Sequence, residues 1–454
     1  MLTEDRQTGA SAPGRNTFLA PDSATARLFA EASRYLPGGT SRLHYHFSPY
    51  PIYAQAGRGC VVTDVDGVER LDFLNNMTAL IHGHAHPAVT AAIVDQLGRG
   101  SAFSEPTAQE VALARLLVER VPSVEQVHFR NSGTEAVMMA VKLARAFTGR
   151  SRIAKFEGFY HGYYDYVQIS FSSSPANWGD PAAPASVPSS GGLAPAIGED
   201  VLVLPFNDQA GVERLLEHHG GRIAALLVEP LSNRAGMPRP APGFYAFLRE
   251  ITRTYGIVLI FDEVISFRVG PDGAQGRYGG APDLTAFGKI IGGGLPVGAV
   301  GGRREIMALL DPTQGPATVI SGGTYSGNPL TAVAGRAALE LLTPAEYDRL
   351  AALGDRLRRE GTALFRAAGV PGQVTGDGSL FELVLTDAPI VNYRSLPRDA
   401  ATEARLRQLH LNLLDEGVIL SGRGLGCLST PMGEAEIDQF LAALARALAR
   451  LPKN

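Results

Sequence analysis

Short apolar runs alternate with helical stretches through the middle of the chain, as far as about residue 320. The helical stretches include 108–121 and 135–147, and the apolar runs are 223–228, 257–261, 284–287 and 297–300. Uninterrupted apolar runs of this length, separated by helices, are typical of strands in a parallel sheet covered on both faces. The pattern therefore predicts an α/β domain built on a mostly parallel sheet.

The two ends of the chain have a different pattern. Near the start, Asp22 or Ser23 can cap a predicted helix, whose apolar face consists of Leu28, Phe29, Ala32, Tyr35 and Leu36. Short strands are expected within 52–73, around a turn at 64–67. After about residue 330, helices alternate with a strand at 380–385, and the last helix is amphipathic. These regions predict a smaller α+β unit.

We therefore expect a large domain and a small domain built from both ends of the chain. The predicted boundaries are a disordered N-terminus at 1–21, an N-terminal segment of the small domain at 22–85, the large domain at 86–325 and the C-terminal small domain at 326–454. Within the large domain, 172–198 is rich in Ser, Pro, Ala and Gly and holds the only tryptophan, Trp178. A solvated loop and a mobile loop over an active site both fit this composition.

Composition excludes several classes of protein. The chain has 454 residues, and 45% of them are hydrophobic, which is too high for a disordered protein. Its net charge of −4 gives no basic surface for binding nucleic acid or an anionic membrane. Two cysteines cannot form a disulfide framework, and the polar first residues do not read as a secretion signal, so a cytoplasmic location is expected. Glycine is unusually frequent, with 52 of 454 residues against a typical ~7%, which indicates tight turns or backbone close to a ligand.

The segment Asn131-Ser132-Gly133-Thr134-Glu135 follows a predicted strand and opens a helix. Free N–H groups at a helix start, with a glycine that allows close approach, make an anion site suited to phosphate. An ordinary helix cap formed by Ser132 or Thr134 explains the same residues.

Two strand ends carry residues suited to catalysis. Asp262 and Glu263 end the run 257–261, and Lys289 follows the run 284–287. In α/β sheets these ends face the ligand crevice, so Asp262 is a candidate partner for a cation and Lys289 a candidate amine for a Schiff base. A helix cap or core ion pair for Asp262, and a surface position for Lys289, remain alternatives.

Two further segments carry residues that could bind a phosphate or a metal ion. Residues 322–329 begin another helix with the chemistry of a second phosphate site. His82, His84 and His86 alternate along the chain, but no Cys or carboxylate stands at ligand spacing, so no metal is expected.

Taken in order, these segments resemble the class III (fold type I) pyridoxal-phosphate aminotransferases. The resemblance is to the branch with glutamate-1-semialdehyde aminomutase, D-phenylglycine aminotransferase and β-phenylalanine aminotransferase, and covers nearly all of the chain after residue 25. The matching motifs are FRNSGTEA at 129–136, FEGFYHG at 156–162, VEP at 228–230, DEV at 262–264, FGK at 287–289 and GTYSGNP at 323–329.

The resemblance implies a set of roles around pyridoxal 5′-phosphate. Lys289 would carry the cofactor as a Schiff base, and Asp262 would keep the pyridine nitrogen protonated. The remaining cofactor contacts that it implies are Ser132, Gly133 and Thr134 at the phosphate, Val264 and Tyr160 on the two ring faces, His161 and Glu229 beside them, and Thr324 from the partner subunit of a homodimer with a shared active site.

Two arginines bear on the substrate. Arg42, in Pro37-Gly-Gly-Thr-Ser-Arg42, and Arg423, in Leu420-Ser-Gly-Arg-Gly424, stand where this branch places carboxylate-binding arginines. A structural ion pair is the alternative for each. The branch implies transfer of an amino group from an apolar or aromatic amino acid, among them β-amino acids, to 2-oxoglutarate or pyruvate. The alternative is glutamate-1-semialdehyde 2,1-aminomutase. Two departures from the mutase pattern weaken this alternative: the pattern has no arginine at the position of Arg423, and Arg234 stands at or beside the position of the mutase's asparagine.

Overall fold

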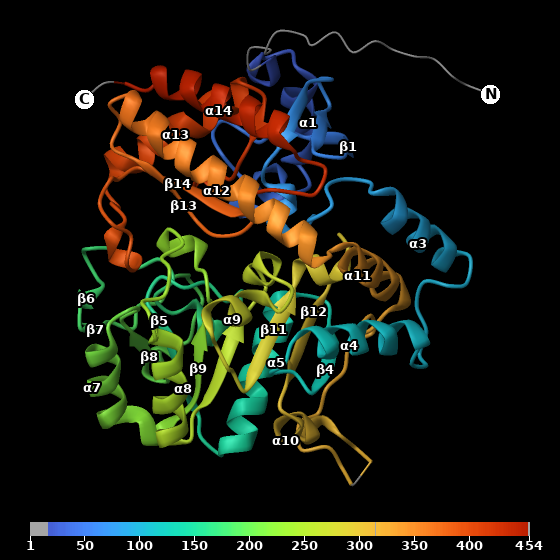
Figure 1. The fold of residues 1–454 in the computed structure, drawn as a ribbon, viewed down its shortest axis with the longest axis vertical. Coiled ribbons are helices and arrows are strands. Elements are labelled where there is room, and N and C mark those ends of the chain that lie inside the picture. Colours follow the sequence, from blue (N-terminus) through green and yellow to red (C-terminus); the bar gives the residue numbers. More distant parts are fainter. Residues whose placement is uncertain (1–16, 314, 453–454) are drawn as a thin grey trace.

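The computed structural model describes residues 17–313 and 315–452. A seven-stranded sheet with the order β4-β12-β11-β10-β9-β5-β8 lies at its centre (Figure 1). The strands are β4 (Gln126–Arg130), β5 (Arg152–Phe156), β8 (Val201–Leu204), β9 (Ile223–Val228), β10 (Val258–Asp262), β11 (Leu284–Gly288) and β12 (Gly298–Gly302). Neighbours are parallel except at β12, which is antiparallel to β4 and β11. The mostly parallel sheet is confirmed, and β12 is its exception.

Helices cover both faces of this sheet because the strands are apolar on both sides. Helix α5 (Gly133–Thr148) buries a row of small and branched residues against one face, among them Ala136, Val137, Ala140 and Val141. Helices α7 (Gln209–His219) and α8 (Phe244–Tyr255) cover the other face. In α8 the buried residues Phe244, Leu248 and Ile251 follow helical spacing, so the helix presents one apolar stripe to the sheet.

The directions of the strands gather the chemically active segments. Since β12 is antiparallel to both of its neighbours, β4 runs parallel to β11, and therefore also to β10, β9 and β5. The carboxyl ends of these five strands meet at one edge of the sheet, where α/β proteins bind ligands. The segments that follow them begin at Asn131, Glu157, Glu229, Glu263 and Lys289.

Both ends of the chain build the part above this edge in Figure 1. One sheet joins β1 (Ala54–Arg58), β2 (Val61–Asp64) and β3 (Glu69–Asp72) to β15 (Val418–Ile419) of the C-terminal region. A second sheet consists of β13 (Gln373–Thr375), β14 (Leu380–Val384) and β16 (Leu425–Cys427). The helices of this part are α1 (Ala24–Ala32), α12 (Pro344–Ala367), α13 (Ala400–Asp415) and α14 (Glu434–Ala449).

Other helices connect or flank these two parts. They are α2 (Asn75–Thr78), α3 (Pro87–Leu97), α4 (Ala108–Arg120), α6 (Ala196–Glu199), α9 (Gly273–Tyr278), α10 (Arg304–Met307) and α11 (Pro329–Leu341). Helix α3 projects from the flank of the molecule and packs on α11 through Val89, Ile93, Ala334 and Ala338 (Figure 1). Across 17–313 and 315–452, every helix is too short or too polar to cross a bilayer.

The structure corrects the prediction for the N-terminal region. Disorder was expected through residue 21, but Thr17–Leu19 form a 3-10 turn whose Phe18 is fully buried against Ile52 and Leu74. Residues 1–16 lie outside the described part. Helix α1 is capped by Ser23 as expected, yet it ends at Ala32, so Tyr35 and Leu36 lie beyond it and are exposed.

The segment 172–198 is an ordered part of the fold. It contains β6 (Gly179–Asp180), β7 (Ala183–Pro184) and α6. Tyr393 donates a hydrogen bond to the carbonyl of Ser173 (2.8 Å), and Arg394 lies over the Trp178 ring at 4.7 Å. The segment therefore joins the large sheet to the C-terminal region, and the cavity described below is lined by residues outside it.

Candidate active site

A cavity of about 430 Å³ opens at the edge where the strands end. Ten of the predicted residues share it: Arg42, Ser132, Gly133, Thr134, Tyr160, His161, Glu229, Asp262, Val264 and Lys289. Thr324 and Arg423 lie elsewhere. The sheet thus brings together five separate sequence motifs in one site.

Lys289 enters the cavity directly after β11. Its backbone is left-handed, with φ 52°, which is unusual for a residue other than glycine and turns the chain sharply at the end of the strand. Burial lowers the pKa of its amine to about 8, against the opposing effect of the nearby carboxyl groups of Glu229 and Asp262. The alternative of a solvated surface lysine is therefore wrong, and about a tenth of this amine is unprotonated at pH 7.

Asp262 ends β10 and is almost fully buried, at 4% exposure. Its Oδ2 lies 2.9 Å from Nδ1 of His161, and its Oδ1 accepts a hydrogen bond from the backbone N–H of Val264 at 3.1 Å. Burial lowers the pKa of His161, so its ring is neutral and its Nδ1–H is the donor. This arrangement holds a buried carboxylate ready for a cationic partner in the cavity.

The acid pair at the end of β10 divides between two environments. Glu263 points into the core, where its carboxyl group is bonded to the Ser266 hydroxyl and to the backbone N–H groups of Ala274 (3.1 Å) and Gln275 (2.7 Å). Burial raises the pKa of Glu263 to about 7. Glu263 therefore anchors the following turn, and Asp262 alone faces the cavity.

A second buried acid, Glu229, stands beside the amine. It follows β9, and its Oε2 accepts a hydrogen bond from the backbone N–H of Tyr160 at 3.4 Å. Burial, and then the charge of Asp262, raise the pKa of Glu229 to about 8. Behind it, the fully buried Lys155 donates to the carbonyls of Ile169 (2.8 Å) and Phe156 (3.2 Å).

The N-terminus of α5 forms one wall of the cavity. Ser132 accepts a hydrogen bond from the N–H of Glu135 (3.2 Å), while Glu135 accepts one from the N–H of Asn131 (2.7 Å). The helix cap is confirmed, and the capped turn lines the cavity, while its use as an anion site stays a prediction. A Cβ on Gly133 would lie 2.9 Å from two Val264 methyl groups, so only glycine fits between this wall and Val264.

Arg42 reaches the cavity from the N-terminal region, where it lies next to Asn76. Arg423 and Thr324 are exposed and lie outside the lining of this cavity. None of the ion pairs among the described residues involves Arg42 or Arg423, so the ion-pair alternative fails for both. Arg234 lies over the rings of Phe171 (4.7 Å) and Tyr160 (5.3 Å), close enough to Arg423 for the two charges to repel.

The histidines of 82–86 have separate partners. His82 is hydrogen-bonded through its two ring nitrogens to Thr430 (2.9 Å) and the carbonyl of Ala338 (2.8 Å), and His84 lies 2.8 Å from Asp72. Across the described ranges, no three metal-ligating side chains converge.

The cavity meets the requirements of a pyridoxal-phosphate site. It offers an amine made partly neutral by burial, a fixed carboxylate, and a helix N-terminus where backbone N–H groups suit a phosphate. On this sheet, such a set defines the class of fold type I pyridoxal-phosphate enzymes.

Comparison with known proteins gives the family. Residues 45–448 match the class III aminotransferases, and the chain belongs to this family, whose members use pyridoxal phosphate; it is a pyridoxal-phosphate-dependent transaminase. It is 41% identical over 427 residues to glutamate-1-semialdehyde 2,1-aminomutase of Methanothermobacter thermautotrophicus, covering 93% of this chain and 98% of the other.

Two solved structures are also similar. An omega-transaminase from Sphaerobacter thermophilus matches with a TM-score of 0.93 and 53% identity, over 95% of this chain and 99% of that one. A β-phenylalanine aminotransferase from Variovorax paradoxus matches with a TM-score of 0.85 and 37% identity, over 95% and 96%.

Two residues of the site are expected from the sequence only in outline: Gly162 as a glycine where the backbone approaches the phosphate, and Asn76 as part of 75–80, a segment expected to contribute to the substrate pocket. Gly162, with φ 92°, packs against Thr134 so closely that a Cβ would lie 2.4 Å from its hydroxyl. Asn76 lines the cavity and contacts Arg42. A pair of adjacent asparagines, which tolerate left-handed backbone, was the available indication for Asn76.

Proposed function

We propose that this transaminase moves the amino group of an apolar or aromatic amino acid, β-amino acids included, to 2-oxoglutarate or pyruvate. The observation that carries the proposal is the guanidinium of Arg42 at the cofactor cavity, bonded to a neutral amide rather than to an acid. A guanidinium in this state is suited to bind a carboxylate through two parallel hydrogen bonds. The omega-transaminase and the β-phenylalanine aminotransferase among the similar structures support this substrate class.

In this proposal the residues divide the work by position. The N-terminus of α5, with Ser132, Gly133 and Thr134, holds the phosphate, and Val264 and Tyr160 enclose the ring. Asp262 supplies a negative charge to the pyridine nitrogen, so that the bound cofactor withdraws electrons from the substrate. With the cofactor bound, Lys289 Nζ would accept the proton from the amine-bearing carbon of the substrate and pass it to the cofactor carbon that takes up the amino group, because its lowered pKa allows both protonation states.

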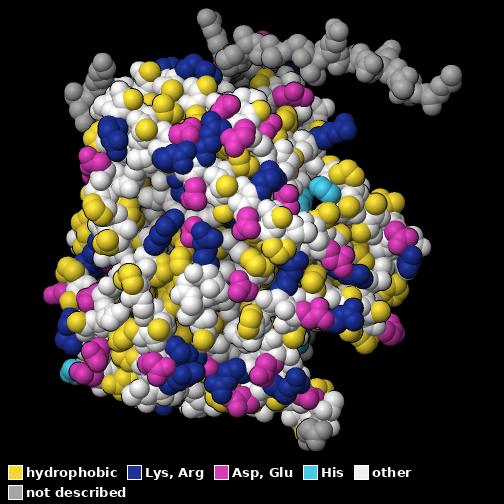
Figure 2. Space-filling view, in the orientation of Figure 1, with side chains coloured by type: hydrophobic (Ala, Val, Ile, Leu, Met, Phe, Trp, Pro, Cys, Tyr) yellow, Lys and Arg dark blue, Asp and Glu magenta, His cyan; other side chains and the backbone are white. Residues whose placement is uncertain are grey.

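We also propose that two chains form a homodimer with shared sites. Apolar side chains are exposed on the projecting flank of α3, the 100–105 loop and α4 (Figure 2): Val94 62%, Leu97 54%, Phe103 48% and Val111 64%. Several exposed apolar side chains on one flank favour an interface with another protein chain.

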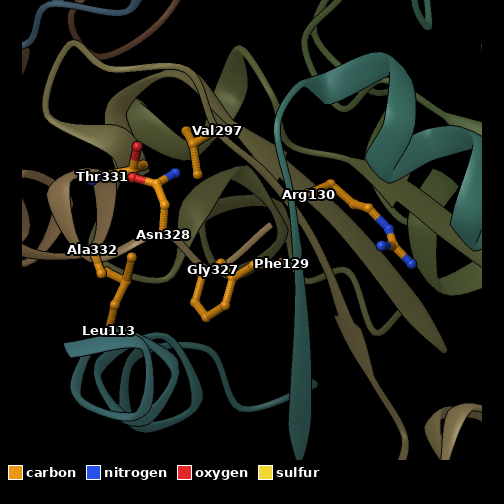
Figure 3. A pocket seen from close by; sticks show the side chains of 8 residues that line it. All are labelled: Leu113, Phe129, Arg130, Val297, Gly327, Asn328, Thr331 and Ala332. Atoms are coloured by element: carbon orange, nitrogen blue, oxygen red, sulfur yellow. Dashed lines mark hydrogen bonds between the residues drawn. The ribbon is translucent and has the colours of Figure 1, made fainter. Parts of the chain in front are cut away.

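The loop that carries Thr324 belongs to the same flank. Arg130, at the end of β4, holds this loop by donating to the carbonyl of Gly322 (3.2 Å) and to the Ser321 hydroxyl. Figure 3 shows Arg130 pointing away from Phe129 on the opposite side of the strand, while Gly327 and Asn328 close a small cavity beneath the loop. Thr324 is exposed on this supported loop, and in the proposed dimer it contributes to the partner's phosphate site.

The second candidate is the aminomutase, which the relative from Methanothermobacter favours at 41% identity. The two functions differ in their need for an acceptor. We expect purified enzyme to turn over β-phenylalanine or phenylglycine repeatedly only when 2-oxoglutarate or pyruvate is present. Conversion of glutamate 1-semialdehyde without any keto acid, together with failure on both aromatic donors, would replace the proposal by the aminomutase.

A further inference from the structure

Arg42 is oriented by one neutral side chain. Its Nη1 donates a hydrogen bond to Oδ1 of Asn76 at 2.6 Å, and both residues line the cofactor cavity. An amide oxygen fixes the guanidinium without cancelling its charge, and Nη2 and Nε keep their hydrogens for another acceptor. Asn76 therefore orients the guanidinium of Arg42 and leaves its positive charge available to a ligand.

Asn76 stands in an unusual backbone conformation. The four residues Asn75, Asn76, Met77 and Thr78 all have positive φ, of 48°, 51°, 54° and 72°. Such a left-handed turn is unfavourable for most residues, and asparagine is among the few that tolerate it. Strained turns of this kind persist only where their surroundings fix them, and they cluster at functional sites.

The surroundings fix this turn at its start through Asp72. Its Oδ1 accepts hydrogen bonds from the backbone N–H groups of Leu74 and Asn75, both at 2.8 Å. Its Oδ2 lies 2.8 Å from Nε2 of His84, the histidine that the sequence analysis left without a role. The carboxylate of Asp72 is nearly buried and thus spans two segments of the chain.

The rest of the turn is held from the other side. The side chain of Asn75 donates to the carbonyl of Cys427 at 3.1 Å, and the buried Arg268 donates to the carbonyl of Thr78 at 2.8 Å. Asn76 is therefore carried on a turn with little freedom to move.

We propose that Asn76 is a positioning residue for carboxylate recognition: held by the Asp72–His84 pair, its neutral amide aims Arg42 at the carboxylate of the amino acid substrate. This inference rests on the proposed function, in which Arg42 binds that carboxylate. It explains why a rigid, left-handed turn stands beside an otherwise flexible arginine side chain. An acid at position 76 would form an ion pair with Arg42 and compete with the substrate.

Asn76→Asp is the sharpest test, because it changes the charge, keeps the shape and suits the left-handed turn. Asn76→Gly is the second variant, since glycine adopts the same φ and removes the amide. Steady-state transamination is followed at a fixed, saturating acceptor concentration, using the best amino acid donor found for the wild type. Inhibition by 3-phenylpropionate, a carboxylate with no amine, reports binding alone.

We expect Asn76→Asp to raise the KM of the donor and the Ki of 3-phenylpropionate about tenfold, as for loss of a charge-assisted contact. The kcat should stay within about threefold, since the reacting groups are untouched. Asn76→Gly should raise both constants by a smaller factor. In an Arg42→Ala background, either change at position 76 should have no further effect.

The outcomes separate the two proposals. If Arg42→Ala raises KM and Ki while both changes at position 76 leave them at wild-type values, the role of Asn76 is refuted and the proposed function stands. A fall in kcat with unchanged Ki would also refute it, because that result indicates damage to the catalytic groups. If Arg42→Ala itself changes neither constant, the carboxylate site of the proposed function fails.

Discussion

Replacing His161 by phenylalanine should weaken cofactor binding without unfolding the protein. The ring is buried at 2% exposure, and its Nδ1 lies 2.9 Å from Oδ2 of Asp262. Without this donor, the hydrogen bond from Val264 remains as the contact shown to hold the carboxylate. The buried negative charge of Asp262 then has one stabilising hydrogen bond fewer.

The size of the effect follows from the type of bond. A hydrogen bond to an ionised group contributes about 1.5–3 kcal/mol, more than one between neutral groups. Since each 1.4 kcal/mol is about a tenfold change in affinity, the dissociation constant should rise roughly 10- to 150-fold. The whole loss applies only if the cofactor is held through the anionic form of Asp262.

Pyridoxamine phosphate is the ligand to use, because it cannot react with Lys289. Apoenzyme is titrated with it, and thermal unfolding of each apoenzyme checks the fold. The matched control is His161→Asn, whose amide N–H stands near the position of Nδ1 and should restore most of the affinity. The reasoning is refuted if the phenylalanine variant binds within about twofold of wild type, or if both variants lose affinity equally.

Two further predictions concern stability. Gly162→Ala should lower the free energy of unfolding by about 1–3 kcal/mol, because φ 92° is strained for alanine and the new Cβ would meet Thr134; denaturant titration measures it, and an unchanged midpoint would contradict it. Lys155→Met should change the pH dependence of stability: burial lowers the pKa of Lys155 to about 7 from 10.5, so between these values the unfolded chain binds the extra proton and the wild type gains stability as pH rises. The free energy of unfolding of the wild type, minus that of Lys155→Met, should therefore grow by up to about 3 kcal/mol from about pH 7 to 9. A flat or falling difference would show that the pKa of Lys155 is not lowered in the folded protein.

The site can be located from the sequence because the directions of the strands bring most of its residues together. Lys289, Asp262 and Glu229 each follow an apolar run, and parallel strands bring their carboxyl ends to one edge whatever the loops do. The turn before α5 was identifiable for a similar local reason, since Ser132 and Glu135 cap the helix within five residues of chain.

Other features depend on contacts between distant segments. The direction of β12 follows from its pairing with β4 and β11, which its apolar pattern does not encode. Phe18 is ordered because Ile52 and Leu74 cover it, and the bond between Arg42 and Asn76 needs a left-handed turn fixed by Asp72 and Cys427. These contacts join residues that are far apart in the sequence, so a local sequence pattern cannot predict them.

The division of the acids at 262 and 263 was also beyond local reasoning. Both residues are buried and adjacent, and only the fold shows that the carboxyl group of Glu263 accepts hydrogen bonds from Ser266 and from the backbone N–H of Gln275. Similarly, the composition of 172–198 suits a mobile loop, whereas Trp178 and Arg394 fasten it to the C-terminal region.

The most direct test of the central claim is whether Lys289 holds the cofactor. Wild type and Lys289→Ala are incubated with pyridoxal phosphate, reduced with borohydride, freed of unbound cofactor and digested for mass spectrometry. We predict that the wild type shows visible absorption before reduction and carries the phosphopyridoxyl mass on the peptide with Lys289, while the variant shows neither. A wild type without the band, or a label on another lysine such as Lys155, would contradict the account.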